Sequence, residues 1–167
     1  MGAQHLLRPV RQEIMFDRVP GMQEIRTHIF IELLRLVALI AILLQMFNDA
    51  VLDHFRNPRN AGELPHADAT VEVSNPVCGD ILKLAVRLEN GQIVEARFLC
   101  RGCTTAIACA SLLTEQLMNR TVAEARALTP DFVSSGLGGL PAATFHGAQL
   151  AADAIRALTE KLSTANR

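Results

Sequence analysis

Four side chains of the middle and C-terminal part of the sequence are of the types that bind a transition metal. They are two thiols, a carboxylate and an imidazole, at Cys78, Cys103, Asp80 and His146. Sulfur and nitrogen donors suit borderline-soft ions such as zinc and iron, and a carboxylate can complete the coordination. Each of the four lies where the backbone is expected to turn, so they can converge from separate elements. We therefore predict a metal or iron–sulfur site at one end of the domain.

The elements that must position these residues are strands first and helices later. Alternation of apolar and polar residues predicts three strands, over 69–74, 81–88 and 93–99. Asn90-Gly91 is typical of a hairpin turn. Helical periodicity and capping residues predict helices over 50–56, 104–119 and 146–162, with short helices starting near Thr121 and Pro130. The fold class is therefore α+β, a three-stranded antiparallel sheet packed against a cluster of helices.

The same periodicity predicts which side chains face the core. They are Leu82, Leu84, Val86 and Leu88 in the second strand, and Val94, Ala96 and Phe98 in the third. Lys83 and Arg87 then face water. Cys103 lies where a strand gives way to a helix, whose N-terminus favours the thiolate form. Cys109, inside that helix, is expected to be a buried structural thiol, and the remaining histidines, His54 among them, ordinary polar residues.

The bulk composition excludes several classes of protein. The chain has 167 residues, half of them apolar and only 4% aromatic, which suits one domain with an aliphatic core. A net charge of −1 gives no basic surface for nucleic acid or anionic membrane. Four cysteines are too few for a secreted disulfide scaffold, so we expect a reducing, cytoplasmic compartment.

The first 45 residues differ from the rest and leave three interpretations open. An apolar run from Ile29 to Phe47 is broken by only three polar residues. Residues 1–45 can be an extension upstream of a natural start at Met46, a helix that packs on the domain, or a membrane anchor. The anchor is disfavoured because Arg35 would cost about 2.5–3.5 kcal/mol at the bilayer centre. We treat this segment as a hydrophobic helical extension, and 46–167 as the domain.

Five short sequences resemble, in order and in spacing, the U-type iron–sulfur cluster assembly scaffolds, the family of IscU and of the NifU N-terminal domain. They are 46–62, Cys78-Gly79-Asp80, 102–108, 112–115 and Leu140-Pro141 followed by His146. The resemblance covers about residues 46–162. It implies an antiparallel sheet backed by helices. It also implies a non-enzymatic scaffold that builds a two-iron cluster from iron and desulfurase-derived sulfur, and then hands the cluster to apo-proteins.

Carried over by position, the resemblance implies a ligand set for iron or the cluster, namely Cys78, Asp80, Cys103 and His146. The family's third cysteine directly follows the histidine, where this chain has Gly147, which offers no side-chain ligand. Cys100 and Cys103 form a Cys-x-x-Cys pair. This pair leaves three readings open: a redox pair, a substitute ligand at Cys100, or chance.

Two further functions are consistent with the same residues. One is a zinc-binding sulfur-transfer partner of a cysteine desulfurase, in which the four side chains close a tetrahedral site. The other is a degenerate regulatory paralogue that docks on a desulfurase and carries nothing. The expected partners are a cysteine desulfurase, apo iron–sulfur proteins and a second copy of the chain. Chaperone binding is not expected, because residues 142–144 depart from the family's recognition stretch.

Overall fold

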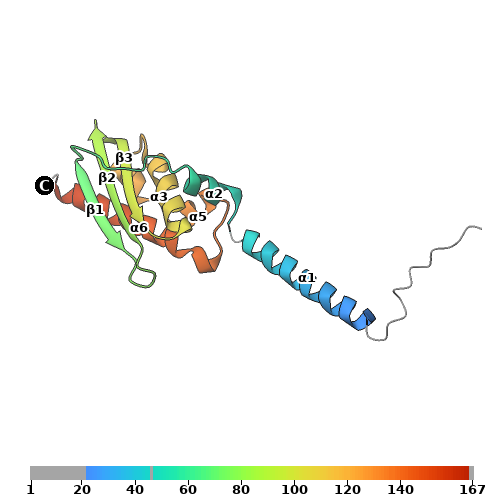
Figure 1. The fold of residues 1–167 in the computed structure, drawn as a ribbon. Coiled ribbons are helices and arrows are strands. Elements are labelled where there is room, and N and C mark those ends of the chain that lie inside the picture. Colours follow the sequence, from blue (N-terminus) through green and yellow to red (C-terminus); the bar gives the residue numbers. More distant parts are fainter. Residues whose placement is uncertain (1–21, 46, 166–167) are drawn as a thin grey trace, which may run out of the picture. The chain divides into compact units, whose positions relative to one another are not determined.

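The computed structural model of this protein describes residues 22–45 and 47–165, with side chains for 27–38 and 47–164 (Figure 1). The chain divides into two compact units, Met1–Leu44 and Gln45–Arg167. Residues 1–21 of the extension, and Met46, the alternative start, lie outside the described residues.

Helix α1 (Met22–Gln45) corresponds to the hydrophobic helical extension expected from the sequence. All of its described side chains, from residue 27 to residue 38, are exposed. An ion pair of 2.8 Å joins Arg35 Nη1 to Glu32 Oε1 across one turn of the helix. Among the helices that the structure describes, none combines the length and the hydropathy needed to cross a bilayer.

Three antiparallel strands form the sheet of the second unit, in the order β1 (Ala69–Ser74), β2 (Ile81–Glu89) and β3 (Gln92–Arg101) (Figure 1). The turn between β2 and β3 is Asn90-Gly91, with φ of 53° and 80°. Two consecutive left-handed residues match the twist of a two-residue hairpin, and asparagine and glycine adopt that conformation most readily. The predicted sheet and its hairpin are therefore confirmed.

A β-bulge changes one of the predicted side-chain directions in β3. Arg87 pairs with Glu95, but Leu88 pairs with Ile93, so Val94 is an extra residue on β3. The alternation is interrupted at this point. Ile93 is completely buried and Val94 only half-buried. The expectation that Val94 faces the core was therefore wrong, because the bulge gives that place to Ile93.

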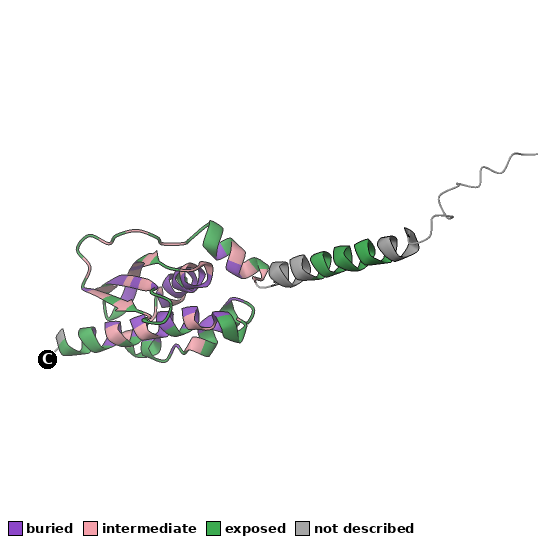
Figure 2. Cartoon of the chain, turned by 60° about the horizontal axis from the view of Figure 1, so that its bottom comes forward, coloured by how far each residue is buried: buried purple, intermediate pink, exposed green. Residues whose placement is uncertain are grey.

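Two long helices of the second unit pack on the sheet, and the shorter helices pack on these two. The helices are α2 (Asp49–Arg56), α3 (Thr104–Leu117), α4 (Val122–Arg126), α5 (Pro130–Gly136), the 3₁₀ turn η1 (Ala142–Thr144) and α6 (His146–Ala165). Helix α3 packs on β3, and α6 packs on β1 and β2. Helix α3 is buried or half-buried at every residue except Glu115, whereas α6 is buried on its inner side and exposed on its outer side (Figure 2).

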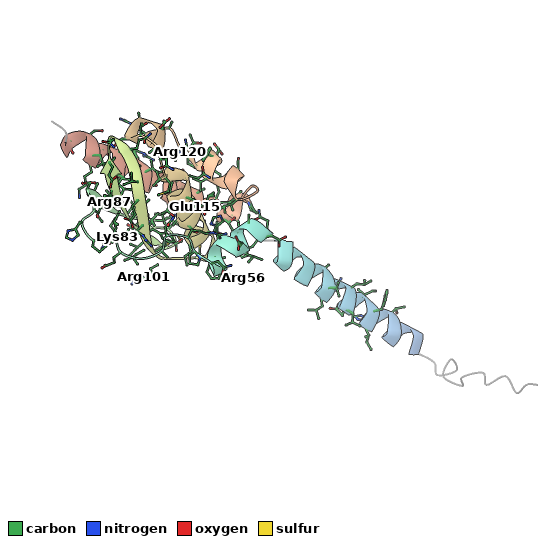
Figure 3. The ribbon with its side chains drawn as sticks, turned by 90° about the horizontal axis from the view of Figure 1, so that it is seen from above. Arg56, Lys83, Arg87, Arg101, Glu115 and Arg120 are labelled. Atoms are coloured by element: carbon green, nitrogen blue, oxygen red, sulfur yellow. The ribbon has the colours of Figure 1, made fainter. Side chains whose placement is uncertain are left out.

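The core between these layers is aliphatic, as the composition predicts. Its largest fully buried side chains include Leu82, Leu84, Ile93, Leu113, Leu117, Leu137, Ile155 and Leu158. Lys83 and Arg87 point to the opposite, solvent-facing side of β2, also as predicted (Figure 3). Burial of aliphatic side chains on one face thus fixes the order of the layers.

Two helix caps were tested by the structure. The capping box of α4 is confirmed, because Thr121 N–H donates to Glu124 Oε2 at 2.8 Å and Thr121 Oγ1 accepts from Glu124 N–H. Helix α2 is capped by Asn48 and begins at Asp49, one residue before the start expected from the sequence. The Asn48 Oδ1 atom accepts a hydrogen bond of 3.0 Å from Val51 N–H, and α2 includes Asp49.

His54 is a buried residue, contrary to the expectation of an ordinary polar histidine. Only 8% of it is exposed, and its Nδ1 lies 2.9 Å from Ser111 Oγ in α3. The same hydroxyl accepts a hydrogen bond of 2.8 Å from Arg59 N–H. Burial lowers the pKa of His54, and the nearby charge of Arg59 lowers that pKa further. These contacts join α2 and the loop after it to α3.

Candidate metal centre

The loop between β1 and β2 is a closed turn that points two donor residues in different directions. Asn75 Oδ1 accepts from Val77 N–H at 2.9 Å, and Asn75 O accepts from Gly79 N–H at 2.8 Å. Gly79 has a φ of +74°, a conformation that glycine adopts without steric strain. As a result Cys78 is exposed at the surface, whereas Asp80, only 5% exposed, turns inward.

Cys103 caps the N-terminus of α3, at the junction that follows β3. Its Sγ accepts a hydrogen bond of 3.4 Å from Ala106 N–H, in the way that a serine hydroxyl caps a helix. Its backbone N–H donates to Asp80 Oδ1 at 3.2 Å. The junction before α3 is therefore attached directly to the end of the β1–β2 loop.

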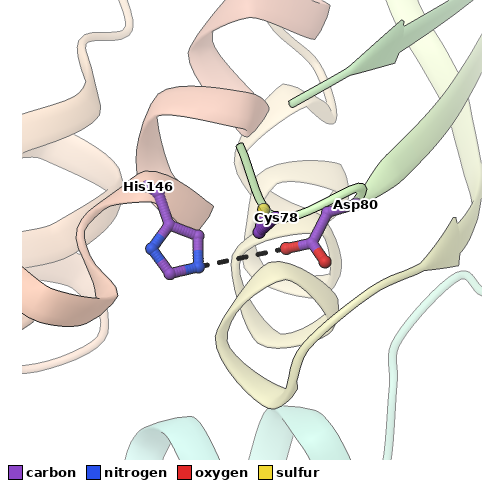
Figure 4. A group of neighbouring side chains, drawn as sticks. All are labelled: Cys78, Asp80 and His146. Atoms are coloured by element: carbon purple, nitrogen blue, oxygen red, sulfur yellow. Dashed lines mark ion pairs between the residues drawn. The ribbon is translucent and has the colours of Figure 1, made fainter. Parts of the chain in front are cut away.

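His146 is the first residue of α6 and completes the convergence (Figure 4). Its Nε2 lies 3.5 Å from Cys103 Sγ and 4.0 Å from Asp80 Oδ2. One ligand atom from each of Cys78, Asp80 and His146 lies within 4.8 Å of the other two. The structure thus brings Cys78, Asp80 and His146 into one group. Cys103 lies beside this group, in contact with His146.

The second carboxylate oxygen of Asp80 is the most informative atom of this cluster. Oδ2 is buried and has no hydrogen-bond partner in the described part of the chain. A buried carboxylate oxygen without a partner is costly unless a cation or a proton satisfies it. This oxygen faces the His146 ring, next to Cys78 (Figure 4). The donor set therefore fits a metal ion or the iron atoms of a cluster.

The thiol of Cys103 differs in one respect from the sequence-based expectation of a favoured thiolate. Burial raises its pKa, and the nearby charge of Asp80 raises the pKa further, while the Ala106 N–H acts in the opposite direction. Without a metal, burial thus outweighs the helix N-terminus. The positive charge of a bound metal would reverse this balance, because metal-bound cysteine is a thiolate.

The other two cysteines lie outside the group of three close donors. Cys100, half-buried in β3, pairs with Leu82 and packs against the core. Burial raises its pKa to about 12. Cys109 is completely buried in α3, and burial raises its pKa to about 12 as well, which fits the expected structural thiol.

Gly147 lies where α6 meets the first turn of α3. A Cβ atom at this position would lie 3.0 Å from Thr105 C and 3.1 Å from Ala106 N. The glycine is buried and allows the two helices to approach closely. The structure therefore gives this glycine a packing role.

Residues 46–166 match the sequence profile of the family described as the NifU-like N terminal domain. Because this match covers most of the chain, the chain belongs to that family of U-type scaffolds. The family membership predicted from the five short sequences is confirmed.

Curated relatives carry names from the same field. The iron–sulfur cluster assembly scaffold protein IscU 1 of Archaeoglobus fulgidus is 43% identical over 111 residues, which are 66% of this chain and 72% of the relative. The scaffold protein IscU of Azotobacter vinelandii is 40% identical over 115 residues, 66% of this chain and 89% of the relative. The Drosophila melanogaster relative, called an iron–sulfur cluster assembly enzyme IscU, is 40% identical over 116 residues, 67% and 75% of the two chains.

Solved structures agree on the fold. A protein from Fervidobacterium islandicum AW-1, described as a cluster assembly scaffold for the SUF system, aligns with a TM-score of 0.57 at 18% identity, covering 69% of this chain and 97% of the other. The N-terminal part of a NifU-like protein from Brucella abortus aligns with a TM-score of 0.51 at 20% identity, covering 70% and 96%. At such identities the likeness concerns the fold alone, and it confirms the α+β class.

Proposed function

We propose that this protein is an iron–sulfur cluster scaffold that binds iron or a two-iron cluster and hands it to apo-proteins. The proposed ligands are Cys78, Asp80, Cys103 and His146. The observation that supports the proposal is the grouping of Cys78, Asp80 and His146 at the buried Asp80 oxygen that has no hydrogen bond, with Cys103 Sγ 3.5 Å from His146 Nε2. The protein would act as a carrier and would turn over no substrate of its own.

The donor set is sufficient for a two-iron cluster within one chain. Such a cluster is held by four protein ligands, and histidine can replace cysteine on one iron. Two thiols, one imidazole and one carboxylate supply four donors, so Gly147 does not leave the count incomplete. A second copy of the chain would be needed only if one of the four donors stayed unused.

The positions of the donors also suit transfer. Cys78 is exposed at the tip of its loop, next to Val77, which is 94% exposed. A partner protein can therefore reach this edge of the site from solvent. The sulfur would come from a cysteine desulfurase, and an apo-protein would displace the exposed donors first. The relatives named above as cluster scaffolds favour this function over the zinc and regulatory alternatives.

Anaerobic reconstitution tests the proposal. The chain is incubated with ferrous iron, cysteine, a catalytic amount of a cysteine desulfurase and a dithiol reductant, which supplies the electrons that convert the transferred sulfur to sulfide. The cluster is followed by its absorbance and by transfer to an apo-ferredoxin. We expect cluster formation and transfer with the native chain, and loss of both in Cys103→Ser and Cys103→Ala. The mass of the loaded protein shows whether one or two copies hold the cluster.

The two Cys103 variants separate ligation from folding. Serine retains an oxygen that can cap α3, whereas alanine removes the cap, so only Cys103→Ala should lose about 1 kcal/mol of unfolding free energy. Equal loss of cluster in both variants then reflects ligation. A native chain that keeps stoichiometric zinc and forms no cluster would reject the scaffold function in favour of the zinc-binding one.

A further inference from the structure

The backbone conformation at Gly102 does not require a glycine. It lies between the end of β3 and the helix-capping Cys103, and its φ is outside the left-handed region. Gly79, in the neighbouring loop, has a φ of +74° and differs in this respect. Gly102 is also exposed to solvent, so burial of the backbone does not exclude a side chain there. Another feature must explain the absence of a side chain.

The space that a side chain at position 102 would take is filled by Asp80. A Cβ atom on Gly102 would lie 2.7 Å from Asp80 Cγ, 2.9 Å from Asp80 Oδ1 and 3.0 Å from Asp80 Cβ. Carbon atoms in contact are normally about 3.5–4.0 Å apart. Asp80 is short and buried, so its carboxylate has little freedom to give way without leaving its place.

The position of the Asp80 carboxylate matters for its proposed ligand role. In this position Oδ1 accepts the hydrogen bond from Cys103 N–H at 3.2 Å, while Oδ2 faces His146 Nε2 at 4.0 Å. A shift of the carboxylate away from position 102 would lengthen the first contact. The same shift would move Oδ2 relative to Cys78 and His146.

We propose that Gly102 is a positioning residue for the metal centre. Its missing side chain lets the Asp80 carboxylate lie against the β3–α3 junction, with one oxygen held by Cys103 and the other free for a metal. Gly102 touches no metal itself and acts through Asp80. This inference rests on the proposed function, because it assigns the carboxylate a ligand role.

A double-mutant cycle on the full chain tests the proposal, with Co²⁺ as the probe. The variants are Gly102→Ala, Asp80→Ala and the combination of both. Removing the support of a metal ligand weakens metal binding by about 10–100-fold. We expect a loss of this size in Gly102→Ala, a similar or larger loss in Asp80→Ala, and no further loss when Gly102→Ala is added to Asp80→Ala.

Denaturant unfolding of the metal-free variants gives a second, independent readout. Of the three atoms nearest to a Cβ at position 102, Asp80→Ala removes Cγ and Oδ1 and leaves Asp80 Cβ, at 3.0 Å. Gly102→Ala should therefore lower the unfolding midpoint clearly in the native background and by less than half as much in the Asp80→Ala background. If Gly102→Ala alone does not fold, a double variant that does fold would show the same clash between the added Cβ and the Asp80 carboxylate.

Gly136→Ala is the matched control, because its Cβ atom would also meet a side-chain atom, Leu112 Cδ2, at 2.7 Å. Gly136 belongs to α5 and its φ is not left-handed, so we expect unchanged Co²⁺ affinity. Equal effects of Gly102→Ala with and without the Asp80 carboxylate, or native affinity in Gly102→Ala, would overturn the positioning role. A native chain that does not bind Co²⁺ would instead reject the proposed function, while the unfolding cycle still reports on the contact.

Discussion

Asp80 is the residue through which the parts of the candidate centre are connected. Its backbone carbonyl accepts from Asn75 N–H at 2.8 Å, which closes the β1–β2 loop. Its Oδ1 holds the start of α3 and its Oδ2 faces the start of α6. A single buried residue therefore connects all three turns, one through its backbone and two through its carboxylate. Gly102 leaves room for its carboxylate, because a Cβ atom there would lie 2.7 Å from Asp80 Cγ.

Gly147→Cys should increase the yield of reconstituted cluster, because it adds a thiol next to His146. The added Cβ would press against the backbone of Thr105 and Ala106, so we expect a loss of about 1–3 kcal/mol of unfolding free energy. Gly147→Ala introduces the same Cβ without a thiol and is the matched control. Cluster yield is measured by absorbance and iron content. Equal yields in the two variants would show that the added thiol is not used.

Among the elements, the starts of α3 and α6 and the β1–β2 loop position the donors, and α2 stabilises this arrangement from the side. The contact between α2 and α3 depends on His54, Ser111 and Arg59. Because Ser111 is completely buried, its hydroxyl and the groups bonded to it would be costly to leave unpaired. The attachment of α2 should therefore respond to the protonation of His54.

Stability should fall in acid because of His54. Burial lowers its pKa from 6.5; Arg59 acts in the same direction, whereas Glu115 and Asp53 act against it. Above about pH 6.5 the His54 ring is neutral in both the folded and the unfolded chain, and its contribution to the unfolding free energy is complete. As the pH falls below this value the unfolded chain binds the proton first, so stability is lost until the lower folded pKa is passed.

The measurement is the unfolding free energy of the native chain and of His54→Gln between neutral pH and mildly acidic pH. The native chain should lose more stability on acidification than the variant. His28→Gln, which replaces an exposed histidine of α1, should follow the native curve. Parallel curves for the native chain and His54→Gln would show that His54 does not cause the loss of stability in acid.

For the whole molecule, the division into two units is the main feature. The first unit exposes large apolar side chains on all sides of α1, among them Ile29, Phe30, Leu33, Leu34 and Val37. The second unit contains the sheet, its helices and all four proposed ligands. Cluster binding should therefore depend on the second unit.

Deletion of residues 1–44 should change the unfolding free energy of the remaining chain by less than about 0.5 kcal/mol, since the hydrophobic core in the described part of the chain consists of residues of the second unit. Cluster yield should also be unchanged. Denaturant unfolding and reconstitution of the two chains side by side provide the measurement. A larger loss of stability would support the interpretation in which the extension packs on the domain.

Much of the fold was predictable because its causes are local. The hairpin at Asn90-Gly91, the capping box at Thr121 and the two periodicities depend on residues a few positions apart. The burial of His54 was not predictable in this way, because its partner Ser111 is 57 residues further along the chain. The place of Ile93 depends on a bulge that exists only once β2 and β3 are paired.

The types of the proposed donors, the family and the turns that carry the donors could be predicted from the sequence, because side-chain chemistry and turn preferences belong to single residues and short segments. The burial of Asp80, the exposure of Cys78 and the place of Asp80 beside Gly102 became visible in the folded chain. Distances between turns that are 23 and 43 residues apart depend on how the sheet and helices pack. Packing is a property of the whole core, and no short stretch of sequence contains it.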